Sequence, residues 1–517
     1  MRNWKIWPAS GEREEIVSLT ERIHTQNKFL TGERDLSTLM MDIPGVLCKH
    51  GCCYMACRGL VLSPISGILI ITHGPAGCSY YSWGGNRLHH RPANARHDYY
   101  SYSFSTNMEE SDIIFGGEKK LQQAIKEAVE IFHPPVIAIC STCPVGLIGD
   151  DVQAIAEAAE KEHGIKVLSF SCEGFKSIPG YRLANLGIIE NVIGTGQKNV
   201  GKYPVNIIGE FYNGRRAKEI ARIFQQIGYD IVAVLMGDGS YDDLQSAQQA
   251  KLNLFSSDKV VADLVDVMQD KFGTRWLRFN FIGMDNIINS LKNMAGFFGN
   301  PELLSKTEDL IAKELERVKD SMDNYKLKLK DKVAVIFEDE FVTRHYKALL
   351  ADLEVSPVTV GNELLCLPGQ NEIGFLSAIE SGGNAPATQD DTRYDTDLEH
   401  YHINFPVSLY EKIKTKIKLA HDHAVRSNPA LGSILISNLS QSETEQLLIA
   451  LQPDIYFPGI KEKFAGVGAA SPSCFFNADE YRFDYGGFQG AVHLARDLLM
   501  TMNMAVWQND VAPWRRI

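Results

Sequence analysis

Short runs rich in β-branched residues alternate with amphipathic helical stretches along most of this chain. The predicted strands are Ile68–Thr72, Val136–Cys140, Val167–Ser171, Val205–Gly209 and Asp230–Met236. Helical patterns lie between them, at Lys119–Phe132, Asp151–His163 and Arg215–Ile227. Regular alternation of strand and helix is typical of parallel sheets covered by helices. We therefore expect an α/β fold with mostly parallel sheets.

The chain of 517 residues is long enough for about three domains. A charged helical stretch from Pro301 to about Lys330 precedes a new predicted strand at Val333–Phe337, which indicates a boundary near residue 330. We assign residues 1–40 to a polar extension that wraps a partner. Residues 41–204, 205–330 and 331–517 are predicted to form three Rossmann-like α/β domains.

The last predicted domain contains one more strand–helix–strand unit and a segment in which the alternation of strands and helices is absent. Strands at Ser433–Ser437 and Asp454–Phe457 flank a predicted helix at Glu443–Leu451. Residues from about 364 to 428 are rich in Gly, Asp and Asn with little periodicity, and we predict that they form a surface insertion.

Composition and charge exclude several function classes. Hydrophobic residues make up 44% and charged residues 22%, as in an ordinary globular protein. A formal net charge of −12 argues against nucleic acid as a partner, since phosphate binding needs clustered Lys and Arg. The sequence has neither a signal-peptide pattern nor an apolar run long enough for a membrane helix, so we expect a cytoplasmic protein with no membrane partner.

The ten cysteines gather in the first part of the chain. Seven of them lie between residues 48 and 143; the full set is Cys48, Cys52, Cys53, Cys57, Cys78, Cys140, Cys143, Cys172, Cys366 and Cys474. In a long intracellular chain such cysteines are core residues or metal ligands more often than a disulfide framework.

Three of these cysteines stand in loops that suit a metal cluster. Cys78 follows the strand Ile68–Thr72 in a turn with two glycines and a proline, and Cys143 follows the strand Val136–Cys140. Cys52 lies in a third glycine-containing loop. Thiolates are soft ligands for iron–sulfur clusters, and three from separate loops leave further positions to another chain. The alternative interpretation of each of these three residues is that it is a cysteine packed in the core.

At these residues the chain resembles the α subunits of nitrogenase component 1 over about residues 41–517. The motifs that carry the resemblance are, in order, His73-Gly-Pro-Ala-Gly-Cys78, the stretch 104–117, Cys143-Pro-Val-Gly-Leu-Ile-Gly-Asp-Asp151, Cys172-Glu-Gly-Phe175 and Gly459-Ile-Lys-Glu-Lys-Phe464. In that family the cysteines matching Cys52, Cys78 and Cys143 hold the P-cluster, an iron–sulfur cluster shared with a homologous β subunit.

The resemblance also implies partners. It predicts an α2β2 tetramer of three-domain α/β subunits and an ATP-dependent iron protein reductase that docks on the tetramer. The positions that match the family's docking surface are Phe132, Ile148 and Asp150.

The chain departs from the family at the second cofactor, an iron–sulfur cluster that carries molybdenum, vanadium or iron. The family's cysteine and histidine ligands fall on Ser257 and Asn477, which are poor ligands for soft sites. Cys474 is the candidate replacement thiolate, and its alternative is a packed core cysteine. The other positions that match the cofactor pocket are Asn86, Arg87, Arg344, His345 and Lys461, and the loop at Lys176–Arg182 is shortened.

Three functions therefore stay open at this point. The leading one is the α subunit of a two-component reductase that relays electrons through the interface cluster to a buried site, with dinitrogen and protons as substrates by resemblance. The second is a scaffold subunit that holds a cofactor precursor during assembly. The third is a reductase of another substrate, such as a tetrapyrrole. The sequence assigns no catalytic residue.

Overall fold

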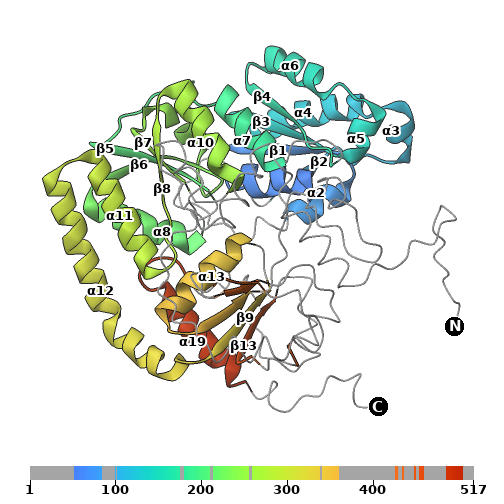
Figure 1. Ribbon diagram of the computed structural model, residues 1–517. Coiled ribbons are helices and arrows are strands. Elements are labelled where there is room, and N and C mark those ends of the chain that lie inside the picture. The colour runs from blue at the N-terminus through green and yellow to red at the C-terminus, as the bar shows by residue number, and fades with distance from the viewer. Residues whose placement is uncertain are drawn as a thin grey trace, which may run out of the picture.

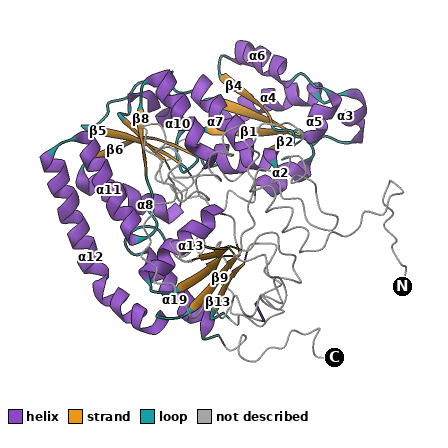
Figure 2. Ribbon diagram, viewed as in Figure 1, coloured by secondary structure: helices purple, strands orange, loops and turns teal. Residues whose placement is uncertain are grey.

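The computed structural model describes residues 52–83, 99, 102–174, 180–209, 214–255, 259–337, 340–359, 426–428, 433–435, 448–449, 453–458 and 485–504. Within these residues the strands form three separate sheets, each covered by helices (Figures 1 and 2). No helix among them is long and apolar enough to cross a membrane.

The first sheet has the strand order β2-β1-β3-β4 and is parallel throughout. Its strands are β1 (Ile68–His73), β2 (Phe104–Ser105), β3 (Val136–Ser141) and β4 (Lys166–Ser171). The associated helices are η2 (Met55–Leu62), α2 (Ala76–Trp83), α3 (Glu110–Phe115), α4 (Glu118–Phe132), α5 (Cys143–Ile148), α6 (Val152–His163) and α7 (Gly180–Asn191).

The two faces of this sheet pack against different helices. Alternate residues of β3 separate the faces: Val136, Ala138 and Cys140 contact the side of η2 and α7, whereas Ile137 and Ile139 contact α4 and α6. This alternation follows from the two-residue period of side-chain direction in a strand. Because both faces are buried, the strands are continuously apolar, as in parallel sheets generally.

The second sheet has the order β6-β5-β7-β8 and is also parallel. It contains β5 (Tyr203–Ile208), β6 (Tyr229–Leu235), β7 (Leu252–Phe255) and β8 (Arg275–Arg278). The helices that accompany it are α8 (Gly214–Ile227), α9 (Tyr241–Gln245), η4 (Ala247–Gln249), α10 (Lys259–Phe272) and α11 (Met284–Phe298).

The third sheet has the order β11-β12-β10-β9-β13. Its strands are β9 (Val333–Phe337), β10 (Ser356–Thr359), β11 (Arg426–Asn428), β12 (Ser433–Leu435) and β13 (Ile455–Pro458), with helices α13 (Glu340–Asp352) and α19 (Gly490–Met502). Only β11 runs antiparallel to its neighbour among the described strands.

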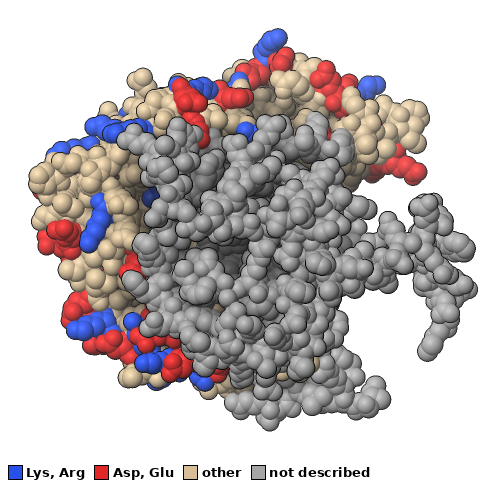
Figure 3. Space-filling model, in the orientation of Figure 1, with Lys and Arg blue, Asp and Glu red and all other residues tan. Residues whose placement is uncertain are grey.

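The long helix α12 (Pro301–Leu329) connects the second and third sheets (Figure 1). It begins at Asn300, whose side chain accepts hydrogen bonds from the amides of Glu302 and Leu303, and Pro301 occupies its first turn. Its apolar residues share one hydrophobic core with both neighbouring sheets. Acidic and basic side chains are interspersed on the described surface visible in Figure 3.

The strands and helices predicted between residues 68 and 337 are confirmed, with ends that shift by one or two residues. Residues 426–428, at the end of the predicted surface insertion, form strand β11, because their backbone pairs with β12 at the sheet edge although their side chains are polar. Residues 1–40, the rest of the insertion and most of Glu443–Leu451 lie outside the described residues, and the domain limits stay predictions.

A buried carboxyl group at the end of α13 gives the fold a pH dependence. Asp352 accepts a hydrogen bond from Met284 N at 2.9 Å. Burial, with a smaller contribution from the nearby Asp285, raises the pKa of Asp352 to about 7. The folded chain keeps a proton that the unfolded chain releases near pH 4, so stability falls as the pH rises from about 4 to about 7.

We expect Asp352→Asn to increase the free energy of unfolding at pH 8 by on the order of 2 kcal/mol, a figure reduced for partial solvent screening. The amide oxygen can still accept from Met284 N. Thermal melts should show a gain that shrinks as the pH is lowered toward about 4. Glu354→Gln is the control, since its carboxylate lies on the surface with long contacts of 3.9 and 4.0 Å to Lys326 and Lys330. An equal gain in stability for Asp352→Asn at pH 8 and at a pH of about 4 would contradict the prediction.

Candidate metal centre

The two loops that carry Cys78 and Cys143 are held together by hydrogen bonds at the carboxyl ends of neighbouring strands. Strands β1 and β3 pair in parallel with His73 opposite Ser141. The next residue, Thr142, donates from its amide and its hydroxyl to His73 O at 3.1 and 3.2 Å. Cys78 then lies in the first turn of α2, and Cys143 is the first residue of α5. The strand pairing therefore fixes the position of one loop relative to the other.

Gly74 allows these loops to come this close. Its φ is +155°, and a Cβ there would lie 2.8 Å from Thr142 Cγ2 and still closer to Thr142 Oγ1. Only a residue without a side chain fits between the two backbones. The glycine in the predicted turn thus serves the close approach of the loops.

Cys52 reaches the same place from a third segment. It stands at the start of the segment that leads into η2, and its carbonyl accepts from Ala56 N at 3.0 Å. Burial raises the pKa of the Cys78 thiol, and the nearby thiols of Cys52 and Cys143 raise it further. Cys52 and Cys143 therefore both lie near enough to Cys78 to act on its thiol electrostatically, and their joint binding of one cluster stays a prediction.

The surroundings of these thiols fit an iron–sulfur cluster shared with another chain. Cys52 is exposed, and Cys78 and Cys143 are half-buried, so all three can face a partner. Gly174 N donates to Cys143 Sγ at 3.3 Å, which stabilises a thiolate. Tyr81 on the same helix as Cys78 is 79% exposed, as expected of a residue that another surface covers. Thiolate donors suit such a cluster.

The predicted docking residues divide into different environments. The Asp150 side chain is only 4% exposed and accepts from Gly117 N at 3.0 Å and pairs with His73 Nε2 at 3.0 Å. Burial lowers the pKa of His73, although Asp150 opposes this, so a neutral imidazole can donate from Nε2–H to the carboxylate. We call the segment 147–151 the docking loop. Asp150 thus joins the docking loop to the loop of Cys78 and does not present its carboxylate to a partner.

Phe132 and Ile148 are half-buried and pack against the core of the first sheet. The Phe132 ring lies 5.0 Å from Phe104 and 5.3 Å from Tyr102, measured between centroids. The exposed apolar residue of the docking loop is Leu147, at 76%. Leu147 belongs to the segment Leu147–Asp151 that matches the family's docking surface, and the six-residue helix α5 between Thr142 and Gly149 is too short to bury every apolar side chain.

Most residues predicted for the second cofactor lie outside the described residues. These are Ser257, Asn477, Cys474, Asn86, Arg87, Lys461 and the side chain of Arg344. His345 is described and is 4% exposed within α13. The placement of the second cofactor site therefore stays a prediction.

Comparisons with known proteins agree with this fold and site. A family model described as nitrogenase component 1 type oxidoreductase matches residues 52–503. The nitrogenase molybdenum-iron protein alpha chain of Clostridium pasteurianum is 36% identical over 482 residues, covering 92% of this chain and 90% of that protein. The alpha chain of Methanosarcina barkeri is 36% identical over 505 residues, covering 97% and 94%.

Two further similarities concern assembly and structure. The nitrogenase iron-molybdenum cofactor biosynthesis protein NifE of Methanococcus maripaludis is 29% identical over 476 residues, covering 90% of this chain and 86% of that protein. A solved structure titled nitrogenase Cp1 at pH 5 superimposes with a TM-score of 0.74 at 34% identity, covering 92% of each chain.

Parallel sheets with thiols gathered at their carboxyl ends define a metal-binding α/β protein. The family match covers most of the sequence, so the chain belongs to the nitrogenase component 1 type oxidoreductases, in the branch of the alpha chains.

Proposed function

We propose that this chain is the α-type subunit of a nitrogenase-type two-component reductase. Its partners are a homologous β subunit, in an α2β2 tetramer, and an ATP-dependent iron protein. The observation that carries the proposal is the convergence of Cys52, Cys78 and Cys143 from three loops at one accessible edge of the first sheet. Alpha chains of nitrogenase molybdenum-iron proteins are the relatives with the higher identities given above.

The residues at the carboxyl ends of β1 and β3 each contribute to cluster binding or to docking in this proposal. The three thiolates hold the cluster, which supplies one-electron transfer when bound. Thr142 and Gly74 keep the loops of Cys78 and Cys143 in register. The hydrogen bonds of Asp150 to His73 and Gly117 hold the docking loop against the loop of Cys78, so a partner seated on Leu147 would be at a fixed distance from the thiols. By family the electrons would reach dinitrogen and protons.

A second candidate function is a scaffold for cofactor assembly. It is favoured by the similarity to NifE and by the replacement of the family's cofactor ligands by Ser257 and Asn477. A scaffold releases its cofactor, so weak ligands at these positions are compatible with transfer.

Metal analysis and activity of the native complex separate the two functions. The chain is purified with its natural partner, and iron, molybdenum and vanadium are measured per heterodimer. Reduction of protons and acetylene is then assayed with the iron protein and ATP. A reductase is expected to hold more iron than the interface cluster needs and to reduce acetylene. Iron that matches the interface cluster alone, with no acetylene reduction, would rule the reductase out, and a bound precursor that transfers to an apo-enzyme would establish the scaffold.

A further inference from the structure

A second group of cysteines lies inside the first domain, apart from the thiols of the interface edge. The Sγ atoms of Cys57, Cys140 and Cys172 all lie within 4.8 Å of one another. The three residues are 0%, 0% and 1% exposed. Among the residues that the structure describes, Cys52, Cys78 and Cys143 do not form such a close group. We call Cys57, Cys140 and Cys172 the buried thiol group.

The fold itself brings this group together. Cys140 lies on the face of β3 that contacts η2, and its register partner on β4 is Phe170. Cys172 is two residues beyond Phe170, so its side chain is a diagonal neighbour of Cys140. Cys57 completes the group from η2, which packs over the same face. Three separate elements thus each contribute one thiol.

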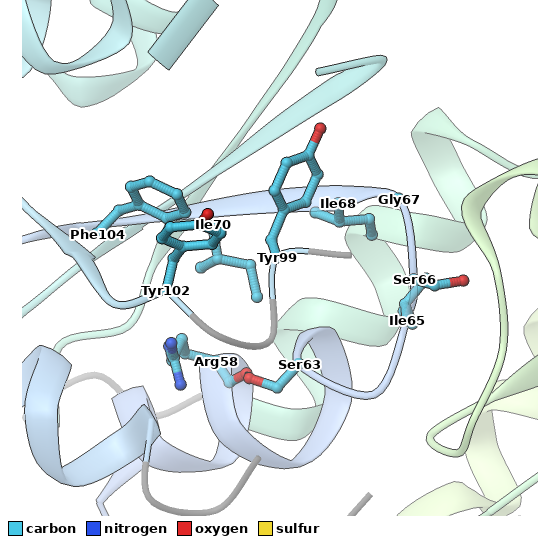
Figure 4. Close-up of a pocket in the computed structure, with 10 residues that line it drawn as sticks. All are labelled: Arg58, Ser63, Ile65, Ser66, Gly67, Ile68, Ile70, Tyr99, Tyr102 and Phe104. Atoms are coloured by element: carbon cyan, nitrogen blue, oxygen red, sulfur yellow. The ribbon is translucent and has the colours of Figure 1, made fainter. Parts of the chain in front are cut away.

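A buried cation stands beside the group. Arg58 follows Cys57 in η2 and is only 2% exposed. Its Nε and Nη1 atoms have no hydrogen-bond partner among the described residues. Figure 4 shows Arg58 among the residues that line a pocket, with its side chain beneath Tyr102 in this view. A buried guanidinium is costly unless negative charge lies nearby, so Arg58 points to negative charge in this group.

We propose that Cys57, Cys140 and Cys172 form a metal site for one divalent, thiophilic cation of the zinc class. Three thiolates around a divalent ion leave a charge of −1, and Arg58 neutralises it. Zinc–sulfur bonds of about 2.3 Å place three sulfurs roughly 4 Å apart in a planar arrangement, which is compatible with sulfurs that all lie within 4.8 Å of one another. A polynuclear iron–sulfur cluster would not fit between sulfurs this close. The site does not depend on the proposed function, because it shares no ligand with the interface edge.

The test uses the full chain in a background that lacks the interface thiols, Cys52→Ser/Cys78→Ser/Cys143→Ser. The purified protein is loaded with Zn²⁺, passed through a desalting column and assayed for zinc per chain. We expect about one tightly held zinc, and its loss when Cys57→Ser, Cys140→Ser and Cys172→Ser are added. The matched control is Cys53→Ser, a half-buried cysteine outside both groups. Retention of the zinc in the chain without the buried thiol group would overturn the proposal.

X-ray absorption at the zinc edge keeps the test valid if the variants fail to fold. In the background protein, the loaded zinc should have three sulfur neighbours at about 2.3 Å. A first shell of oxygen and nitrogen, or the absence of retained zinc from a chain with a native circular dichroism spectrum, would show that the three cysteines are packed thiols only.

Discussion

The Cys78→Ala variant is expected to lose the interface cluster and with it the transfer of electrons to the substrate site. Cys78 contributes one of three thiols that converge on one edge, and its half-buried position gives no other soft donor the room to replace it. Loss of a supporting residue around a metal site already costs about 10- to 100-fold in affinity. Removal of a ligand should therefore reduce both cluster iron and iron-protein-dependent activity by at least about 100-fold.

Iron analysis and electron paramagnetic resonance of the purified complex check this expectation. Cys53→Ala is the matched control, because Cys53 is adjacent to Cys52 but is not one of the converging thiols. It should keep wild-type iron and activity. If Cys78→Ala kept the full iron content, the three thiols would be packed cysteines and the reductase proposal would lose its main support.

Local sequence patterns predicted the strands of the first two sheets because side-chain periodicity and β-branched runs act over short distances. They also predicted that Cys78 and Cys143 would each follow a strand, and the structure shows that these strands, β1 and β3, are neighbours. The antiparallel strand β11 could not be found in this way. Its residues are polar, and only backbone pairing with β12 defines it.

The buried thiol group and the role of Asp150 depend on contacts between distant parts of the chain. The alternation of side-chain direction along β3 and β4 could have placed Cys140 and Cys172 on one face of the sheet. The sequence did not reveal that η2 would bring Cys57 to the same face. Asp150 was predicted on a docking surface because its position matches the docking surface of the family that the chain resembles. Its carboxylate is instead buried against His73, which is 77 residues earlier in the sequence.

Gly74→Ala is expected to destabilise the chain and to separate two of the cluster ligands. The new Cβ would meet Thr142 Cγ2 at 2.8 Å, with the hydroxyl oxygen closer still, at a φ of +155° that residues with side chains rarely adopt. Overpacking and backbone strain each cost about 1–3 kcal/mol, so the free energy of unfolding should fall by about 2–5 kcal/mol. Thermal melts and iron content measure the two effects.

Gly77→Ala is the matched control for this variant. Gly77 lies in the first turn of α2, one residue before Cys78, and a Cβ there would have nothing within 4 Å. It should melt like the wild-type chain. Addition of Thr142→Ala to Gly74→Ala should restore part of the stability, because it removes the clashing Oγ1 and Cγ2 atoms and leaves the close contact with Cβ of residue 142 and the backbone strain.

The iron content of the Gly74→Ala variant shows whether cluster binding depends only on the number of thiol ligands or also on their positions. This variant keeps all three thiols, so a chain that folds and yet retains little iron would show that the spacing of Cys78 and Cys143 controls cluster binding. Full iron in a destabilised chain would mean that the cluster tolerates a shift of the loops. In that case the bonds from Thr142 to His73 would serve folding only, and the register between β1 and β3 would not set the geometry of the metal site.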